Sequence, residues 1–203
     1  MNLRWLVWCV PCLLLAACGG DEPAPSVEAL LADGQAAFQR GEDAVMAART
    51  EAEFDAALEG YSEAVAGWME AASAWRKAFR MIDPTDEEKS RRTMLSFRIA
   101  RAFAKAARHG RDPDWASLRA DHAFIWFDQT ARLAPGMRQV HYERARLFDS
   151  EIESVRDLVA AHGAYMKYLA LVDFDSNTIP ESEQERVKHA RSRAMALAPR
   201  KGG

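Results

Sequence analysis

The fold class of this 203-residue chain is decided by residues 54–82, which read FDAALEGYSEAVAGWMEAASAWRKAFRMI. Large or apolar residues recur there at alternating steps of four and three, the spacing of one helical face with a 3.5-residue period. The members of this stripe are Phe54, Leu58, Tyr61, Val65, Trp68, Ala72, Trp75, Phe79 and Ile82. Thr50 and Glu53 have the spacing of a capping box. The pattern therefore predicts one long helix over residues 51–82.

On both sides of this stretch, capping residues and helix breakers divide the chain into about seven predicted helices. No segment alternates with a period of two, so no strand is predicted. The predicted helices cover residues 26–40, 51–82, 86–108, 113–133, 137–150, 154–172 and 180–197. Residues 43–49 also have helical composition, and the sequence leaves open whether they join the long helix. The turns are short, which predicts an all-α fold of three antiparallel hairpins and a C-terminal capping helix.

Two of the predicted helices carry apolar residues around most of their circumference. One contains Phe124, Ile125, Trp126 and Phe127, and the other is apolar over residues 165–172 apart from Lys167. Helices of this kind are usually covered on more than one side. We therefore expect both of them in the middle of the helical stack.

A weak internal repeat runs through these helices. A small residue is followed four positions later by an aromatic residue in three pairs, Ala71 with Trp75, Ala123 with Phe127, and Ala161 with Tyr165. Prolines at 84 and 135 follow the first two pairs. This pattern resembles the tetratricopeptide repeat, which implies a right-handed array whose first helices line a groove. Several helices are longer than the unit of about 34 residues allows, and an unrelated helical bundle is the alternative.

The amino terminus has the layout of a secretory signal. Arg4 precedes the apolar run of residues 5–15, which is shorter than the roughly 20 residues that cross a bilayer. The run contains Cys9 and Cys12, whose CxxC spacing is also that of redox dithiols and half zinc sites. With no further ligands nearby, we expect both cysteines to leave with the signal.

The sequence Leu15-Ala16-Ala17-Cys18 resembles the lipobox of bacterial lipoproteins. The resemblance implies cleavage before Cys18, a diacylglycerol on its sulfur and a further acyl chain, such as palmitate, on its amino group. The chain then divides into a signal peptide (1–17), a lipidated tether (18–25), an all-helical domain (26–198) and a polar tail (199–203). In lipoproteins of enteric bacteria, an aspartate after the cysteine retains the protein at the inner membrane. Gly19 stands at this position, so the resemblance implies the periplasmic side of the outer membrane over the inner membrane.

Composition excludes some classes of partner. Without residues 1–17, the chain has 26 Lys and Arg against 30 Asp and Glu, so its net charge is a mild −4. This balance gives no reason to expect nucleic acid as a partner. All three cysteines lie within residues 9–18, so an acylated mature chain has neither a free thiol nor a disulfide.

The sequence shows no recognisable catalytic, cofactor or metal motif. It lacks GxSxG, a glycine-rich phosphate loop and HExxH. The five histidines are scattered without any i,i+4 pair, at positions 109, 122, 141, 162 and 189. Acidic residues gather at the starts of predicted helices, where they offset the helix dipole. We therefore expect no cofactor, no metal and no enzymatic activity.

One surface stripe is a candidate partner-binding site. Its members, at helical spacing in the predicted helix 86–108, are Arg91, Arg98, Arg101, Lys105 and Arg108. They share a face that points away from Leu95, Ile99 and Phe103. This stripe is either a solvated face with counter-charges from neighbouring helices or a surface for lipid phosphates or an acidic partner segment. The repeat resemblance would place it in a peptide-binding groove.

Together these features predict a lipid-anchored interaction module of the bacterial envelope. By resemblance, such lipoproteins act as protein-binding adaptors or assembly factors for outer-membrane proteins, secretion pores or pili. One alternative is an envelope enzyme with a dispersed site. Another is a structural lipoprotein that self-associates through the stripe of residues 54–82. The sequence leaves the oligomeric state and the identity of the partner open.

Overall fold

The computed structural model describes residues 24–52, 54–175, 179 and 181–199, and these ranges contain seven α-helices and no strand. The helices are α1 (Val27–Thr50), α2 (Phe54–Met81), α3 (Lys89–His109), α4 (Pro113–Leu133), α5 (Arg138–Phe148), α6 (Leu158–Asp175) and α7 (Glu181–Leu197). The predicted all-α class is confirmed. The signal peptide, Cys18 and most of the tether lie outside the described residues, as do residues 200–203 of the tail.

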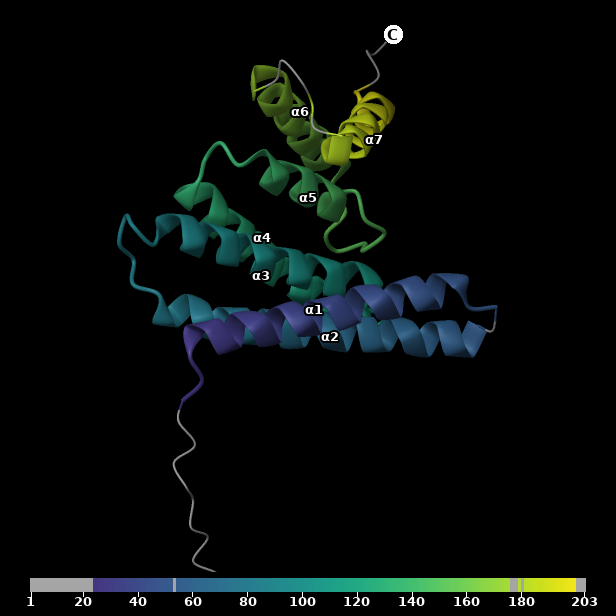
Figure 1. Cartoon of the computed structure of the whole chain (residues 1–203). Helices are drawn as coiled ribbons and strands as arrows, with labels where there is room; N and C mark the ends of the chain where they lie inside the picture. Colours follow the sequence, from purple (N-terminus) through teal and green to yellow (C-terminus); the bar gives the residue numbers. More distant parts are fainter. Residues whose placement is uncertain (1–23, 53, 176–178, 180, 200–203) are drawn as a thin grey trace, which may run out of the picture.

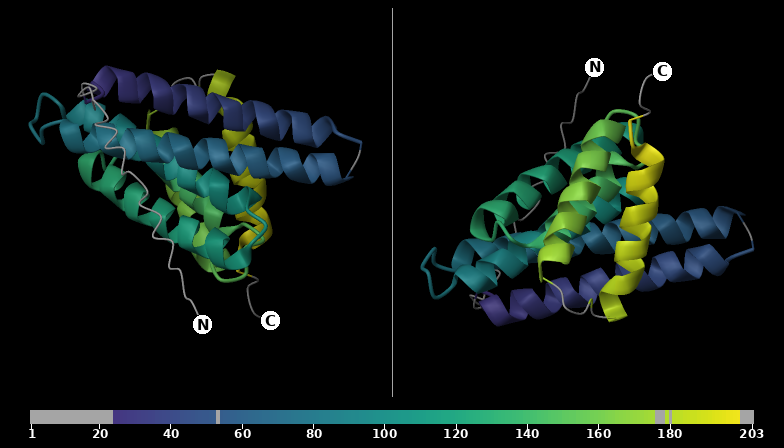
Figure 2. Two further views of the ribbon diagram at one scale, coloured as in Figure 1. Left: turned by 90° about the horizontal axis from the view of Figure 1, so that it is seen from below. Right: turned by 90° about the horizontal axis from the view of Figure 1, so that it is seen from above.

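The helices pack as three successive hairpins, α1–α2, α3–α4 and α5–α6, with α7 against α6. Figure 1 shows the α1–α2 hairpin at one end of the molecule and the α6–α7 pair at the other. In Figure 2 the end of α1 and the start of α2 project together beyond the remaining helices. α3 contacts α2, α4 and α5, so it links all three hairpins. This arrangement is consistent with a helical array.

Local signals set several helix boundaries as predicted. At the start of α1, the Ser26 Oγ accepts a hydrogen bond of 3.1 Å from the Ala29 amide. At the start of α4, the Asp112 carboxylate accepts bonds from two first-turn amides, and Pro113 occupies the first helical position. Proline suits that position because its missing N–H would have no helical partner there. Gly110 ends α3.

The predicted end of the first helix at Arg40 is wrong, because α1 continues through Gly41 to Thr50. Residues 43–49 therefore belong to α1 and not to the long helix. Gly41 is a contact residue, since a Cβ there would lie 2.7 Å from Trp68 Cδ1 and 2.9 Å from the Ala64 carbonyl oxygen. A glycine allows a close approach of two helices as well as a helix end.

Three other helices begin later than predicted. α2 begins at Phe54 and not at residue 51, and the predicted capping role of Thr50 is wrong, because Thr50 is the last residue of α1 and its hydroxyl donates a hydrogen bond of 2.9 Å to the Ala47 carbonyl oxygen. Residues 86–88 form a turn, in which the Glu88 amide donates to Thr85 Oγ1 at 3.3 Å, and α3 begins at Lys89. α6 begins at Leu158, because Asp157 caps it instead of Ser154. The Asp157 Oδ1 accepts hydrogen bonds of 3.0 and 2.9 Å from the next amides. Asp157 thus caps α6 directly, whereas Glu88 makes no side-chain capping hydrogen bond at the start of α3, and Thr85 closes the turn before it.

The main core lies between the first two hairpins. Trp68 and Trp75 of α2 are 0% and 1% exposed, and they pack with buried α3 and α4 side chains such as Ile99 and Phe127. From Trp68 to Ile82, the predicted stripe is thus buried within its own chain. This part of the stripe is not a free surface for a second copy.

A second cluster joins the last three helices through Tyr142, Tyr165, Tyr168 and Val187. The expectation that the two most apolar helices are covered on both sides is wrong. On α4, Ile125 is 59% exposed, and on α6 Val159 and Met166 are also exposed. α4 and α6 are the second helices of their hairpins, and each leaves one side uncovered.

Candidate functional site

The structure divides the predicted cationic stripe into two parts. Arg91 pairs with Glu28 of α1 at 2.8 Å, where both side chains are well exposed. The Arg98 guanidinium lies 5.8 Å from the centre of a Trp75 ring. These two arginines therefore stay apart from the remaining three cations.

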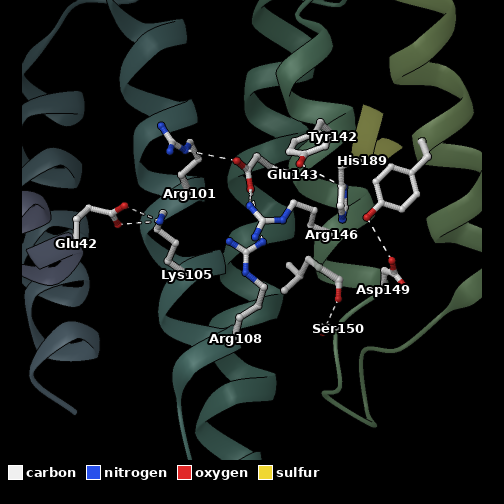
Figure 3. A network of polar contacts seen from close by, with 12 residues as sticks. Glu42, Arg101, Lys105, Arg108, Tyr142, Glu143, Arg146, Asp149, Ser150 and His189 are labelled. Atoms are coloured by element: carbon white, nitrogen blue, oxygen red, sulfur yellow. Dashed lines mark hydrogen bonds and ion pairs between the residues drawn. The ribbon is translucent and has the colours of Figure 1, made fainter. Parts of the chain in front are cut away.

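Arg101, Lys105 and Arg108 meet side chains from two other helices. We call this group the central charge cluster, and its members are Glu42 of α1, Arg101, Lys105 and Arg108 of α3, and Glu143 and Arg146 of α5. Figure 3 shows these side chains converging between the helices. The cluster is built by the first helix of each hairpin. Residues far apart in the sequence thus form one polar centre.

Glu143 is the focus of the cluster. Arg101 Nε lies 3.7 Å from its Oε1, while its Oε2 lies 3.5 Å from Arg108 Nη1 and 3.7 Å from Arg146 Nη1. The guanidinium groups of Arg108 and Arg146 lie next to each other beside this carboxylate (Figure 3). All three distances exceed ordinary N–H···O hydrogen-bond lengths. Arg101 Nε and Arg108 Nη1 are buried and have no hydrogen-bond partner.

Lys105 has a separate partner. Its Nζ lies 2.7 and 2.8 Å from the two Glu42 oxygens, and Glu42 Oε1 also accepts a hydrogen bond of 2.9 Å from Trp68 Nε1. Glu42 is therefore engaged by Lys105 and Trp68. Four cations and two carboxylates leave the central charge cluster with a net charge of +2.

The cluster is deepest at Arg108 and Glu143, whose side chains are 11% and 7% exposed. Arg101 and Arg146 are 30% and 39% exposed, so they lie where the cluster reaches solvent. Removing charged groups from water is costly unless counter-charges and hydrogen bonds compensate. The two buried guanidinium nitrogens without hydrogen-bond partners, Arg101 Nε and Arg108 Nη1, are therefore only partly compensated by Glu143.

Burial and neighbouring charges lower the pKa values of Glu143, Lys105 and His109. Burial alone raises the pKa of the Glu143 carboxyl, but attraction to Arg108, Arg146 and Arg101 outweighs it and lowers that pKa below its usual value. Burial lowers the pKa of Lys105 in spite of its bond to Glu42. His109 contributes no charge at neutral pH, because burial and the nearby Arg108 and Lys105 lower its pKa to about 4.

A second ionic contact fastens α7 to the end of α5. Arg193 donates to both oxygens of Asp149, at 2.7 Å from Nε and 2.5 Å from Nη2. The Tyr165 hydroxyl donates to the same carboxylate at 3.3 Å. Arg138 of α5 pairs in the same way with Glu183 of α7. These contacts hold α7 against α5, and they engage both carboxylate oxygens of Asp149.

A cavity of about 640 Å³ adjoins the central charge cluster at Arg108. It lies between the end of α3, the start of α4 and the loop after α5, and Arg111, Asp114, Ser150 and Glu151 contribute to its lining. No group of three or more His, Cys, Asp or Glu side chains that could hold a metal ion occurs in the described ranges.

Sequence reasoning missed Glu42, Glu143 and Arg146. Glu143 did carry a signal, since it stands three residues after Val140 and four before Leu147 on the buried side of α5. A carboxylate at such a core-facing position requires a cationic partner. The five histidines stay dispersed, and three of them, His109, His122 and His189, contact aromatic rings.

Comparisons with protein-family models, with curated proteins and with solved structures find no match for this chain. None of the helices in the described part is both long enough and apolar enough to span a membrane.

Proposed function

We propose that this protein is a lipid-anchored interaction module of the bacterial envelope, acting as a protein-binding adaptor or assembly factor without a catalytic site. The observation that carries the proposal is the central charge cluster. Its net charge of +2 and its partly exposed arginines suit an acidic segment of a partner protein. The first helices of all three hairpins contribute to it, so one bound segment would contact the whole array.

The proposed anchor is Cys18, within the lipobox-like sequence of residues 15–18. α1 begins at Val27, so only a short tether separates the acylated residue from the helical domain. Residues 19–25 span at most about 25 Å when extended. Two or three acyl chains bind a bilayer firmly. The domain would therefore act close to the lipid surface, on the periplasmic side of the outer membrane.

The anchor is tested by metabolic labelling with palmitate, combined with membrane fractionation. The unmodified sequence should incorporate the label and sediment with membranes. A Cys18→Ser variant should do neither, because a hydroxyl does not replace the thiolate in diacylglycerol transfer. Equal labelling of both forms would exclude lipidation at this residue.

The adaptor function is tested by crosslinking and co-purification from membranes. Arg101→Gln/Arg146→Gln removes two cations from the central charge cluster, and we expect it to lose specific protein partners. Lys77→Gln/Arg80→Gln is the matched control, since it removes the same charge from exposed positions on α2. If both double variants retrieve the same proteins in equal amounts, the cluster does not recognise a partner.

A further inference from the structure

We propose that α6 and α7 form a docking groove for an amphipathic helix of a partner protein, with acidic residues beside the apolar face of that helix. We call this surface the terminal groove. It is formed by Met166 and Leu169 of α6 with Lys188, Arg191, Ala194 and Met195 of α7. The inference goes beyond the proposed function, because the terminal groove shares no residue with the central charge cluster.

The first argument is that apolar side chains are exposed around a hollow. Met166 and Met195 are 49% and 74% exposed, and with Leu169 they line a cavity of about 330 Å³. A second cavity of about 410 Å³ shares Met195 with the first and continues along α7 to Gln184. Exposed apolar patches mark interaction surfaces, and methionine adapts its shape to a partner. The terminal groove is therefore open to a ligand and suited to an apolar one.

The second argument is the position of α7 in the array. Ion pairs join the first helices α1, α3 and α5 in a row, and α7 continues this row because Glu183 pairs with Arg138 of α5. Each earlier first helix packs against the helix that follows it, but no helix follows α7 in the described part of the chain. Figure 1 shows α6 and α7 at the end of the molecule opposite the α1–α2 hairpin. A partner helix in the terminal groove would contact α7 and α6, just as α4 contacts α3 and, through Trp126 and Phe79, α2.

The third argument is charge and shape. Lys188 and Arg191 line the two cavities, and no Asp or Glu of the described residues lines either one. Acidic residues on a partner helix would complement these cations and fix its orientation. In a two-fold dimer the same patch meets itself, so a second copy would bring like charges together. From Gln184 to Ala198 the groove is about 21 Å long, which suits a helix of about 15 residues better than the flat surface of a bilayer.

The test is fluorescence anisotropy with the full chain in nanodiscs of zwitterionic lipid, and empty nanodiscs give the blank. The probes are two labelled amphipathic peptides of about 15 residues, the length that the groove accommodates. They carry the same leucines on one face and differ only in having either Glu or Lys beside them. At low salt we expect the Glu peptide to bind about threefold more tightly, as two partly exposed ion pairs would give, and this preference should fade at high salt.

Substitutions at exposed positions locate the binding surface without disturbing the core. Met166→Gln/Met195→Gln should weaken binding of the Glu peptide about tenfold, because the apolar contact is lost. Met46→Gln/Met94→Gln is the matched control and should leave the affinity unchanged, since it alters two methionines of α1 and α3 that are 59% and 46% exposed. Lys188→Glu should reverse the preference, so that the Lys peptide binds more tightly.

Several outcomes would overturn the terminal groove as a site for an acidic helix. These are equal affinity of the unmodified chain for the two peptides, and equal losses of affinity in the two methionine variants. A dimer in sedimentation that Met166→Gln/Met195→Gln converts to a monomer would assign the groove to a second copy. Binding of a Cys18→Ser chain to anionic vesicles that the same double variant abolishes would assign it to the membrane. Arg101→Gln/Arg146→Gln should leave peptide binding intact, so the groove and the central charge cluster can fail independently.

Discussion

Replacing glycine by alanine should lower the stability of the protein at Gly67, where α1 and α2 approach closely, and raise it at Gly163 of α6. A Cβ at Gly67 of α2 would lie 2.9 Å from the Ala37 carbonyl oxygen, 2.9 Å from the Gly41 nitrogen and 3.1 Å from its Cα. These obstacles are backbone atoms, so no side-chain rotation can relieve them. Gly67→Ala must therefore push the two helices apart along the contact that buries Trp68.

The magnitude follows from two opposing terms. Overpacking in a core costs typically about 1 to 3 kcal/mol, and a rigid backbone obstacle places this site near the upper value. Alanine in place of glycine in a helix interior contributes about 1 kcal/mol of stability. Gly67→Ala should thus lower the free energy of unfolding by about 2 kcal/mol, from the balance of these terms.

Gly163 of α6 is the matched control. It is exposed, and a Cβ there would meet nothing within 4 Å. Gly163→Ala should therefore gain the full helix-propensity term of about 1 kcal/mol. Thermal unfolding followed by circular dichroism should separate the variants by about 6 to 12 °C, at about 2 to 4 °C per kcal/mol for a domain of this size. Equal melting temperatures would refute the close packing of α1 and α2 at Gly67.

Three further predictions concern pH, α7 and α4. Because the folded pKa of His109 is about 4, below the unfolded value of about 6.5, its stabilisation is complete above pH 6.5 and is lost as the pH falls towards 4. The loss should reach about 1 to 2 kcal/mol after allowance for partial exposure, and His109→Gln should flatten the unfolding free energy between pH 7 and about 5.5. Asp149→Ala removes both contacts to Arg193 and should destabilise the docking of α7 by about 2 kcal/mol, seen as faster amide exchange in α7 but not in α2. Asp112→Ala removes the α4 cap and should cost about 1 kcal/mol in urea unfolding, whereas Asp112→Ser should retain most of the stability.

The helix boundaries that the sequence predicted well are those with local causes. The run from Gly110 to Pro113 contains a helix end, an N-cap and a proline, all of which act within a few residues. Gly41 misled the prediction because its role depends on Trp68 of the next helix. From the sequence alone, a glycine that ends a helix cannot be distinguished from a glycine at a helix crossing, because the difference depends on the position of the partner helix.

In the candidate site, too, the features that arise within one helix could be predicted, whereas those that depend on contacts between helices could not. Helical periodicity placed Arg101, Lys105 and Arg108 on one face of α3, and the structure confirms that they share a polar environment. The pairing of these cations with Glu42 and Glu143 could not be predicted, because the two carboxylates belong to helices on either side of α3 in the sequence, even though the buried position of Glu143 indicated that it needs a cationic partner. The interpretation that neighbouring helices supply counter-charges is correct for Lys105, which binds Glu42 at 2.7 Å.

The pairing of helices that are adjacent in the sequence has a consequence for assembly. Each helix finds its main contacts in the preceding or following one, so long-range loop closure is rare and the topological barrier is low. No cysteine occurs after residue 18, so no oxidative step is needed. A polypeptide that is synthesised amino end first can therefore complete each hairpin before the next one is made.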